Sequence, residues 1–248
     1  MSLTLTIVGC GDAFGSGGRR NTCFHLETET SRYFVDFGAS SMVGVNAMGI
    51  DTNAVDAIIL SHLHGDHFGG IPFLILHAHF VTDRTRPLVI AGPPGVEKRI
   101  RDAQEVMFPE SSHIALGFEL GFVEMEPGAT TEVCGAKVEC FEVCHPSGAP
   151  PLALRVHAGG RLFAFSGDSR WLDVLVDVAR DADLFMCECY AFEQDIPYHV
   201  RYRDIEANMP RLAAGRIMFN HLGPEPLARL ANFDPSIVIA EDGMVVEV

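Results

Sequence analysis

Four side chains that can bind a metal ion lie within six residues, in the run His62-Leu63-His64-Gly65-Asp66-His67. The run follows residues 57–60, an apolar stretch typical of a buried strand, so one loop can bring all four side chains together. Imidazole and carboxylate are suitable ligands for Zn, Fe or Mn, and no thiolate is needed. We expect Gly65 to let the backbone come close at this point. The alternative is a solvated His-rich loop that holds no metal.

Three later residues complete a candidate ligand set. His145 follows the predicted strand 138–143, Asp168 follows the strand 163–166, and His221 follows the strand 217–220. The carboxyl ends of strands are the places where α/β sheets usually carry their sites. Each residue alone would be read as structural. Together with the His-rich run they give seven ligands, about the number that two neighbouring metal ions need.

The order of these motifs resembles the metallo-β-lactamase fold in its dinuclear hydrolase form, and the resemblance covers essentially the whole chain. It implies two divalent metal ions per chain, with Zn expected first and Mn or Fe as alternatives. By this resemblance, one ion would be held by His62, His64 and His145. The other would be held by Asp66, His67 and His221, and Asp168 would bridge the two.

Within this superfamily the chain is most similar to the ribonuclease Z-like phosphodiesterase branch. Residues 9–14 followed by Arg20-Asn21-Thr22 resemble the Gly-rich strand and Arg-Asn element of that branch, and residues 61–72 are close to its metal motif. Arg20 and Asn21 are candidates for substrate binding, since a guanidinium suits bidentate contact with phosphate. A surface turn is the alternative for these two residues.

The same branch carries a Glu-then-His pair that maps onto Glu188 and His199. The resemblance implies that this pair binds phosphate and protonates the leaving group. We therefore count Glu188 and His199, together with Asp66, as candidate catalytic residues. The alternative for His199 is a surface histidine with no chemical role.

The chain departs from the tRNA-processing members of the branch in one respect. Those members carry a long flexible arm between the third metal histidine and the bridging aspartate. Here His145 and Asp168 are only 23 positions apart, and two predicted strands occupy most of that interval. The formal net charge of -15 also disfavours broad contact with a phosphate backbone. We therefore expect a small phosphodiester substrate and regard tRNA as unlikely.

Composition places the chain among soluble globular proteins, with 48% hydrophobic and 21% charged residues. There is no export signal at the start and no apolar run long enough to cross a membrane, so we expect a cytoplasmic protein. Seven cysteines with no export signal indicate reduced thiols without assigned chemistry. No linker divides residues 1–248, so we expect a single domain.

Strands and helices are predicted to alternate in two batches. Strands are expected at residues 3–8, 22–26, 33–36, 57–60, 87–91, within 118–143, and at 152–156, 161–166, 184–187, 217–220, 237–240 and 244–247. Helices are expected at 69–80, 96–107, around 171–178, at 205–214 with Pro210 as a break, and at 224–230. This order predicts an α/β fold, a four-layer αββα sandwich of the metallo-β-lactamase type.

These observations predict a dinuclear metal-dependent hydrolase, and specifically a phosphodiesterase for a cyclic nucleotide or cyclic sugar phosphate. Two ions about 3.5–4 Å apart would lower the pKa of a shared water, so that hydroxide attacks phosphorus in line. The alternatives are a thioester, lactone or β-lactam hydrolase, an RNA 3′-end endonuclease, or a metal-binding scaffold without activity. The family resemblance further implies a homodimer.

Overall fold

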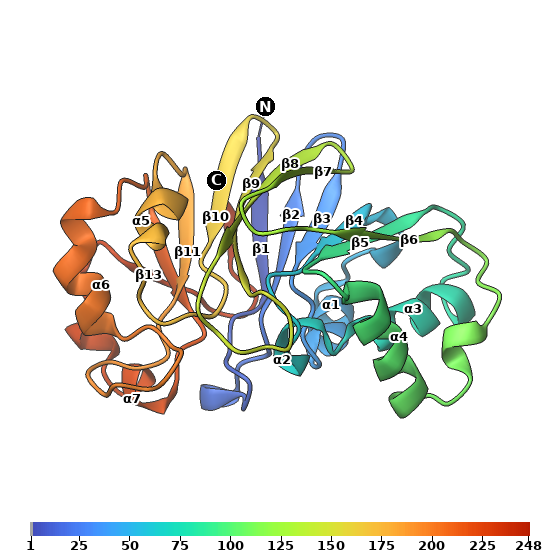
Figure 1. Ribbon diagram of the computed structural model, residues 1–248, viewed down its shortest axis with the longest axis horizontal. Helices are drawn as coiled ribbons and strands as arrows, with labels where there is room; N and C mark the ends of the chain where they lie inside the picture. The colour runs from blue at the N-terminus through green and yellow to red at the C-terminus, as the bar shows by residue number, and fades with distance from the viewer. Residues whose placement is uncertain (1) are drawn as a thin grey trace.

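Two seven-stranded sheets lie face to face in the computed structural model, which describes residues 2–248 (Figure 1). The first sheet has the spatial order β14 (Val245–Glu247), β1 (Thr4–Gly9), β2 (Cys23–Glu27), β3 (Arg32–Val35), β4 (Ala57–Ile59), β5 (Leu88–Gly92) and β6 (Leu120–Glu124). The second has the order β13 (Val238–Ile239), β12 (Ile217–Asn220), β11 (Leu184–Glu188), β10 (Arg161–Phe165), β9 (Leu152–Ala158), β8 (Ala136–Glu142) and β7 (Thr130–Val133).

Helices cover the outer face of each sheet (Figure 1). The first sheet is covered by α1 (Ser41–Met48), α2 (Gly65–Phe68), α3 (Ile71–Phe80) and α4 (Val96–Met107). The second sheet is covered by α5 (Val174–Ala179), α6 (Tyr202–Asn208) and α7 (Pro224–Leu227). The layers therefore follow the order αββα, which confirms the predicted fold class.

Three apolar cores hold these four layers together. Between the sheets, the ring of Phe24 packs edge-on against Phe163 and Phe165, with centroids 6.1 and 5.3 Å apart. The two outer cores join each sheet to its helices, as when Ile75 of α3 and Leu175 of α5 are both fully buried. Strands covered on both faces need apolar side chains on both faces, which explains why all of β4 and the first three residues of β12 are apolar.

Most predicted elements are found, and the differences have local causes. The helix predicted at 205–214 starts earlier, as α6, and ends at Asn208. Pro210 then lies in a 3₁₀ turn, Met209–Arg211, because proline has no N–H with which to continue the helix. The last predicted helix ends sooner, at Leu227. The helix α1 was not predicted from the sequence.

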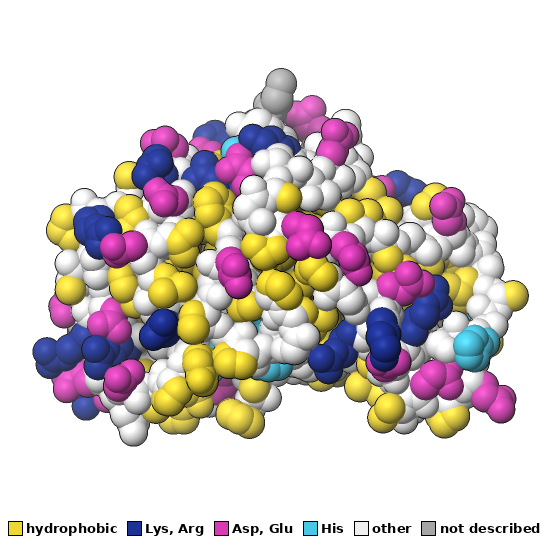
Figure 2. Space-filling view, in the orientation of Figure 1, with side chains coloured by type: hydrophobic (Ala, Val, Ile, Leu, Met, Phe, Trp, Pro, Cys, Tyr) yellow, Lys and Arg dark blue, Asp and Glu magenta, His cyan; other side chains and the backbone are white. Residues whose placement is uncertain are grey.

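The surface and the thiols agree with a globular chain. No helix among residues 2–248 is long and apolar enough to cross a membrane. All seven cysteines are free, as expected from the composition. On the face shown in Figure 2, basic side chains are interspersed with acidic ones and do not form one continuous basic track.

Candidate dinuclear metal centre

The predicted ligands meet at one edge of the two sheets. His62 follows β4, Asp168 follows β10, and His221 comes directly after β12. His145 follows β8, which runs in the same direction as β10 because both pair antiparallel with β9. The carboxyl ends of these strands therefore share an edge, as expected for an α/β site. The first sheet provides the loop 62–67, and the second provides His145, Asp168 and His221.

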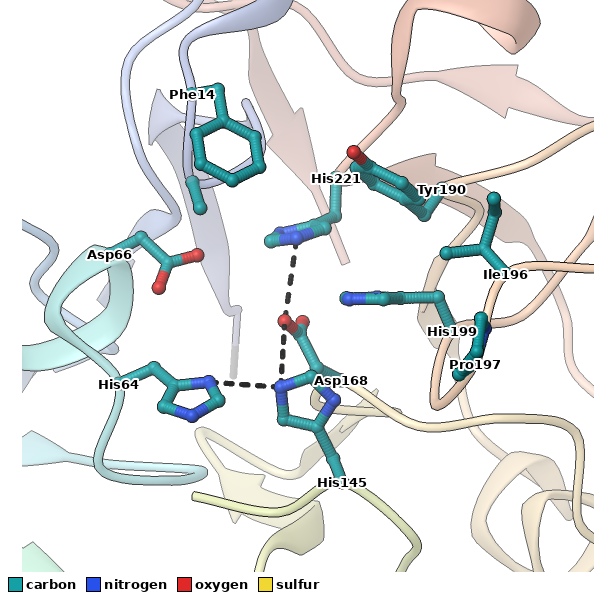
Figure 3. Close-up of a pocket in the computed structure, with 11 residues that line it drawn as sticks. Phe14, His64, Asp66, His145, Asp168, Tyr190, Ile196, Pro197, His199 and His221 are labelled. Atoms are coloured by element: carbon teal, nitrogen blue, oxygen red, sulfur yellow. Dashed lines mark hydrogen bonds and ion pairs between the residues drawn. The ribbon is translucent and has the colours of Figure 1, made fainter. Parts of the chain in front are cut away.

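The ligand atoms fall into two adjoining groups. One consists of His62, His64 and His145, and the other of Asp66, His67, Asp168 and His221, with ligand atoms in each group within 4.8 Å of one another. The Asp168 Oδ2 lies 3.3 Å from Nε2 of His67 and of His221. It lies 3.9 Å from Nε2 of His62 and of His145. Asp168 thus stands between the two groups. Dashed lines in Figure 3 mark the contacts of its carboxylate with His145 and His221.

Buried polar atoms in these groups fit bound cations. Nε2 of His62, Nε2 of His67 and Oδ1 of Asp168 are buried and have no hydrogen-bond partner within residues 2–248. Leaving such atoms without a partner costs free energy, and coordination to a metal ion would satisfy them. Imidazole and carboxylate donors suit Zn, Mn or Fe. The residues present therefore fit divalent metal ions.

A second set of groups orients the ligands, and sequence reasoning did not find it. The fully buried Asp36 accepts hydrogen bonds from the Ser61 amide at 2.8 Å and the Ser61 hydroxyl at 2.7 Å. Its Oδ2 also lies 2.6 Å from Nδ1 of His67. A proton on this Nδ1 leaves the Nε2 lone pair free for a metal. The Tyr198 carbonyl plays the same part for His145, whose Nδ1 lies 3.1 Å away.

Close backbone approach occurs at a different glycine from the one predicted. A Cβ built on Gly65 would meet no atom within 4 Å, so the expectation for this residue is wrong. A Cβ on Gly38 would lie 2.0 Å from the carbonyl oxygen of Asp66. The loop after β3 therefore presses against the metal-binding loop at Gly38. Gly65 instead begins α2, where its small size is not required.

Glu188 and His199 lie together beside the metal ligands. The Glu188 carboxylate is fully buried, and its Oε2 lies 2.9 Å from His199 Nδ1. The His199 ring contacts His145, with centroids 4.9 Å apart, and points toward Asp168 in Figure 3. Burial disfavours the charged imidazole, but the Glu188 carboxylate outweighs this and raises the pKa of His199 to about 9. The imidazole is therefore protonated at neutral pH.

Arg20 and Asn21 do not line the pocket that contains the ligands. Arg20 Nε donates to the Val8 carbonyl at 2.7 Å and lies 3.6 Å from the Asp242 carboxylate. Asn21 donates from Nδ2 to the Asp12 carbonyl at 2.9 Å, and its Oδ1 accepts from Ser40. Both side chains hold the loop that joins β1 to β2.

The pocket has a polar floor and apolar walls. Its volume is about 380 Å³. His64, Asp66, His145, Asp168, His199 and His221 form the floor. Phe14 forms one wall, and Tyr190, Ile196 and Pro197 form the other (Figure 3). Ala13 also lines the pocket. The arrangement can hold an anionic group on the floor and a less polar group between the walls.

Comparisons with known proteins show which proteins this chain resembles in sequence and in fold. The ribonuclease Z of Halorubrum lacusprofundi is 26% identical to this chain, in an alignment that covers 100% of this chain and 98% of the relative. The metallo-β-lactamase fold protein YhfI from Bacillus subtilis has a TM-score of 0.79 and 19% identity, covering 100% of both chains. The short form of human tRNase Z has a TM-score of 0.79 and 22% identity, covering 98% of each chain.

These likenesses confirm the predicted fold and the expected resemblance to ribonuclease Z, so the chain is a metal-dependent hydrolase. The model of one family, described as Anti-Pycsar protein Apyc1, matches residues 3–234. Because this match spans nearly all of the 248 residues, the chain belongs to the Anti-Pycsar protein Apyc1 family.

Proposed function

We propose that this protein is a phosphodiesterase for a small phosphodiester of the cyclic nucleotide or cyclic sugar phosphate type. The observation that carries the proposal is the contact between the buried Glu188 carboxylate and the partly exposed His199, next to Asp168 on the pocket floor. An imidazolium at this place can donate a proton to an alkoxide that leaves phosphorus. A carbonyl-ester hydrolase with an activated leaving group has less need of such an acid.

The seven ligands named above would hold two divalent ions. Bound in such a pair, divalent ions activate water and neutralise charge that develops on phosphoryl oxygens. Asp168, which stands between the two groups, orients the attacking water through Oδ2. His199 protonates the departing oxygen from Nε2, while Glu188 holds Nδ1 and keeps the ring in place.

Three observations support a small substrate. The interval between His145 and Asp168 is filled largely by β9 and β10 and contains no inserted arm. The alignment with the Halorubrum ribonuclease Z extends over 311 positions, 63 more than the 248 residues of this chain, so that relative carries additional segments. The net charge of -15 opposes a long nucleic acid.

An RNA 3′-end endonuclease is the second candidate, and the whole-chain similarity to ribonuclease Z favours it. The absent arm and the acidic surface weigh against it. Hydrolysis of a thioester, lactone or β-lactam is the third candidate, because activated water can also attack a carbonyl carbon. Zn as the metal, a homodimer and a cytoplasmic location stay predictions.

Comparing turnover on four substrates tests the proposal. Protein of known metal content is assayed on a 3′,5′-cyclic nucleotide, a precursor tRNA, a thioester and a lactone. The proposal predicts kcat/KM highest for the cyclic nucleotide by a wide margin. Efficient cleavage of the precursor tRNA alone would favour the endonuclease, and turnover of the thioester or lactone alone would favour a carbonyl-ester hydrolase.

A further inference from the structure

We propose that Glu225 is a positioning residue that acts through His199, because it holds the loop from which this imidazole reaches the pocket. The inference rests on the proposed function, in which His199 protonates the leaving group. Glu225 belongs to α7 and does not line the pocket that contains the ligands. Any effect of Glu225 on turnover must therefore pass through the loop that connects β11 to α6.

This loop, residues 191–201, is closed at its two ends by backbone contacts. The Ala191 amide donates to the Val200 carbonyl at 3.4 Å, and the Tyr202 amide donates to the Ala191 carbonyl at 2.8 Å. At the exposed tip, Tyr198 has a φ of 67°, a conformation that residues other than glycine rarely adopt. An exposed tip of this kind needs contacts beyond its closed ends to keep one conformation.

Glu225 supplies such contacts to the first half of the loop. Its Oε2 accepts hydrogen bonds from the amides of Phe192, Glu193 and Gln194, at 3.1, 3.4 and 3.4 Å. Burial raises the pKa of Glu225, but these amides outweigh it and lower the pKa below its ordinary value. The side chain is therefore a carboxylate at neutral pH, and hydrogen bonds to a charged acceptor are stronger than those between neutral groups.

The second half of the loop contacts the candidate site. His199 Nδ1 lies 2.9 Å from the Glu188 carboxylate, and the Tyr198 carbonyl lies 3.1 Å from Nδ1 of His145. The His199 amide donates to the Ile196 carbonyl at 3.3 Å, and both of these residues line the pocket (Figure 3). Ile196 is only two positions beyond the last amide that α7 holds.

A loop that is loosened in its first half would therefore misplace the imidazole in its second half. A general acid must come within hydrogen-bond reach of the oxygen that it protonates. A displacement of about 1 Å that arises far from the reacting atoms can lower a rate by about 100-fold. The contacts of Glu225 thus assign it to the positioning of His199, without contact with the substrate.

Glu225→Ala and Glu225→Gln test this role, each alone and in combination with His199→Ala. The glutamine variant keeps an oxygen that can accept from the same amides. Glu105→Ala is the matched control, because the Glu105 carboxylate accepts from the amides of Glu110 and Ser112 at 2.9 and 3.0 Å, outside the pocket. Turnover is measured on a 3′,5′-cyclic nucleotide and on bis(p-nitrophenyl) phosphate, at equal metal content.

We expect Glu225→Ala to lower kcat on the cyclic nucleotide by about 10- to 100-fold, and on the p-nitrophenyl ester by less than about three-fold. In the His199→Ala background the same change should cost less than about two-fold, because residues that act through one another have non-additive effects. Glu225→Gln should recover most of the rate, and Glu105→Ala should match the wild type.

Hydrogen exchange of the metal-free proteins gives a readout that does not depend on turnover. A peptide that covers residues 195–200 should exchange faster in Glu225→Ala than in the wild type, although Glu225 accepts from none of its amides. Equal losses on the two esters, a full loss in the His199→Ala background, or unchanged exchange would overturn the role of Glu225 and leave the phosphodiesterase proposal standing. A wild type that hydrolyses neither ester would overturn both.

Discussion

The Asp36 carboxylate lies 2.6 Å from Nδ1 of His67, and both side chains are completely buried. The contact joins the end of β3 to the metal-binding loop that follows β4. Asp36 also accepts two hydrogen bonds from Ser61, so three contacts hold its carboxylate in position. Asp36 thereby sets which nitrogen of His67 faces the centre.

Asp36→Asn should therefore weaken metal binding. An amide cannot provide the negative charge that supports the Nδ1–H of His67, so we expect a 10- to 100-fold loss of affinity for one of the two ions. Competition with a chelator of known affinity measures this loss. Asp102→Asn, a change of the same type at the exposed Lys98–Asp102 ion pair, should leave affinity unchanged. Equal metal affinity in the wild type, Asp36→Asn and Asp102→Asn would contradict the role given to Asp36.

His199→Ala should reduce turnover in a manner that depends on the leaving group. An alkyl alkoxide needs a proton as it departs, and we expect a loss of about 10²–10⁴-fold for an alkyl phosphodiester. A p-nitrophenyl ester leaves without help and should lose only a few-fold. A plot of log kcat against leaving-group pKa measures the difference as a steeper slope in the variant. Parallel plots for variant and wild type would remove the assignment of a general acid.

Gly38→Ala and Gly65→Ala should have opposite outcomes although both glycines adjoin the metal loop. A Cβ on Gly38 would overlap the Asp66 carbonyl at 2.0 Å, so we expect a loss of about 3 kcal/mol in the free energy of unfolding. Gly65→Ala meets open space at the start of α2 and should be neutral or slightly stabilising. Urea unfolding of the metal-free proteins measures both. Equal destabilisation would contradict the account of this loop.

The candidate metal ligands could be predicted from the sequence because the loop 62–67 and each of the three later residues follow a short apolar run. Such runs end at a sheet edge, and His62, Asp168 and His221 each come within three residues of the end of their strand. Asp36 also follows a strand, but one carboxylate without a second ligand nearby in the sequence gives no distinct signal. The Tyr198 carbonyl that orients His145 is a backbone group, so no residue type marks it.

Other features depended on tertiary contacts that periodicity does not reveal. The helix α1 has apolar residues on several sides and a glycine, Gly44, whose position lies against Val8 and Arg20. Its sequence therefore lacks the regular polar face of a surface helix. The close approach assigned to Gly65 belongs to Gly38, because contact between two loops cannot be read from either loop alone.

His25 should make the protein sensitive to mild acid. It is 5% exposed on β2, and burial lowers its pKa to about 4, below the ordinary value of 6.5. The unfolded chain therefore takes up a proton more readily, so stability is complete above about pH 6.5 and falls as the pH drops toward 4. The contribution of this residue to the free energy of unfolding is smaller at pH 5 than at pH 7 by about 2 kcal/mol.

His25→Leu removes the titrating imidazole. It should therefore reduce the difference in the free energy of unfolding between pH 7 and pH 5 by about 2 kcal/mol. Urea unfolding with excess chelator, so that metal release does not contribute, measures the difference at each pH. The exposed His113→Leu should retain the difference seen in the wild type. A His25→Leu protein with an unchanged pH dependence would show that burial of this imidazole does not limit acid stability.

We propose that the seven candidate ligands form a dinuclear centre that hydrolyses phosphodiesters. The most direct test is hydrolysis of bis(p-nitrophenyl) phosphate by protein whose metal content is measured, next to Asp168→Ala checked for folding by circular dichroism. We predict turnover that rises until about two divalent ions are bound per chain and is lost in Asp168→Ala. Fully metallated, folded wild type without turnover, or undiminished turnover in Asp168→Ala, would contradict the claim.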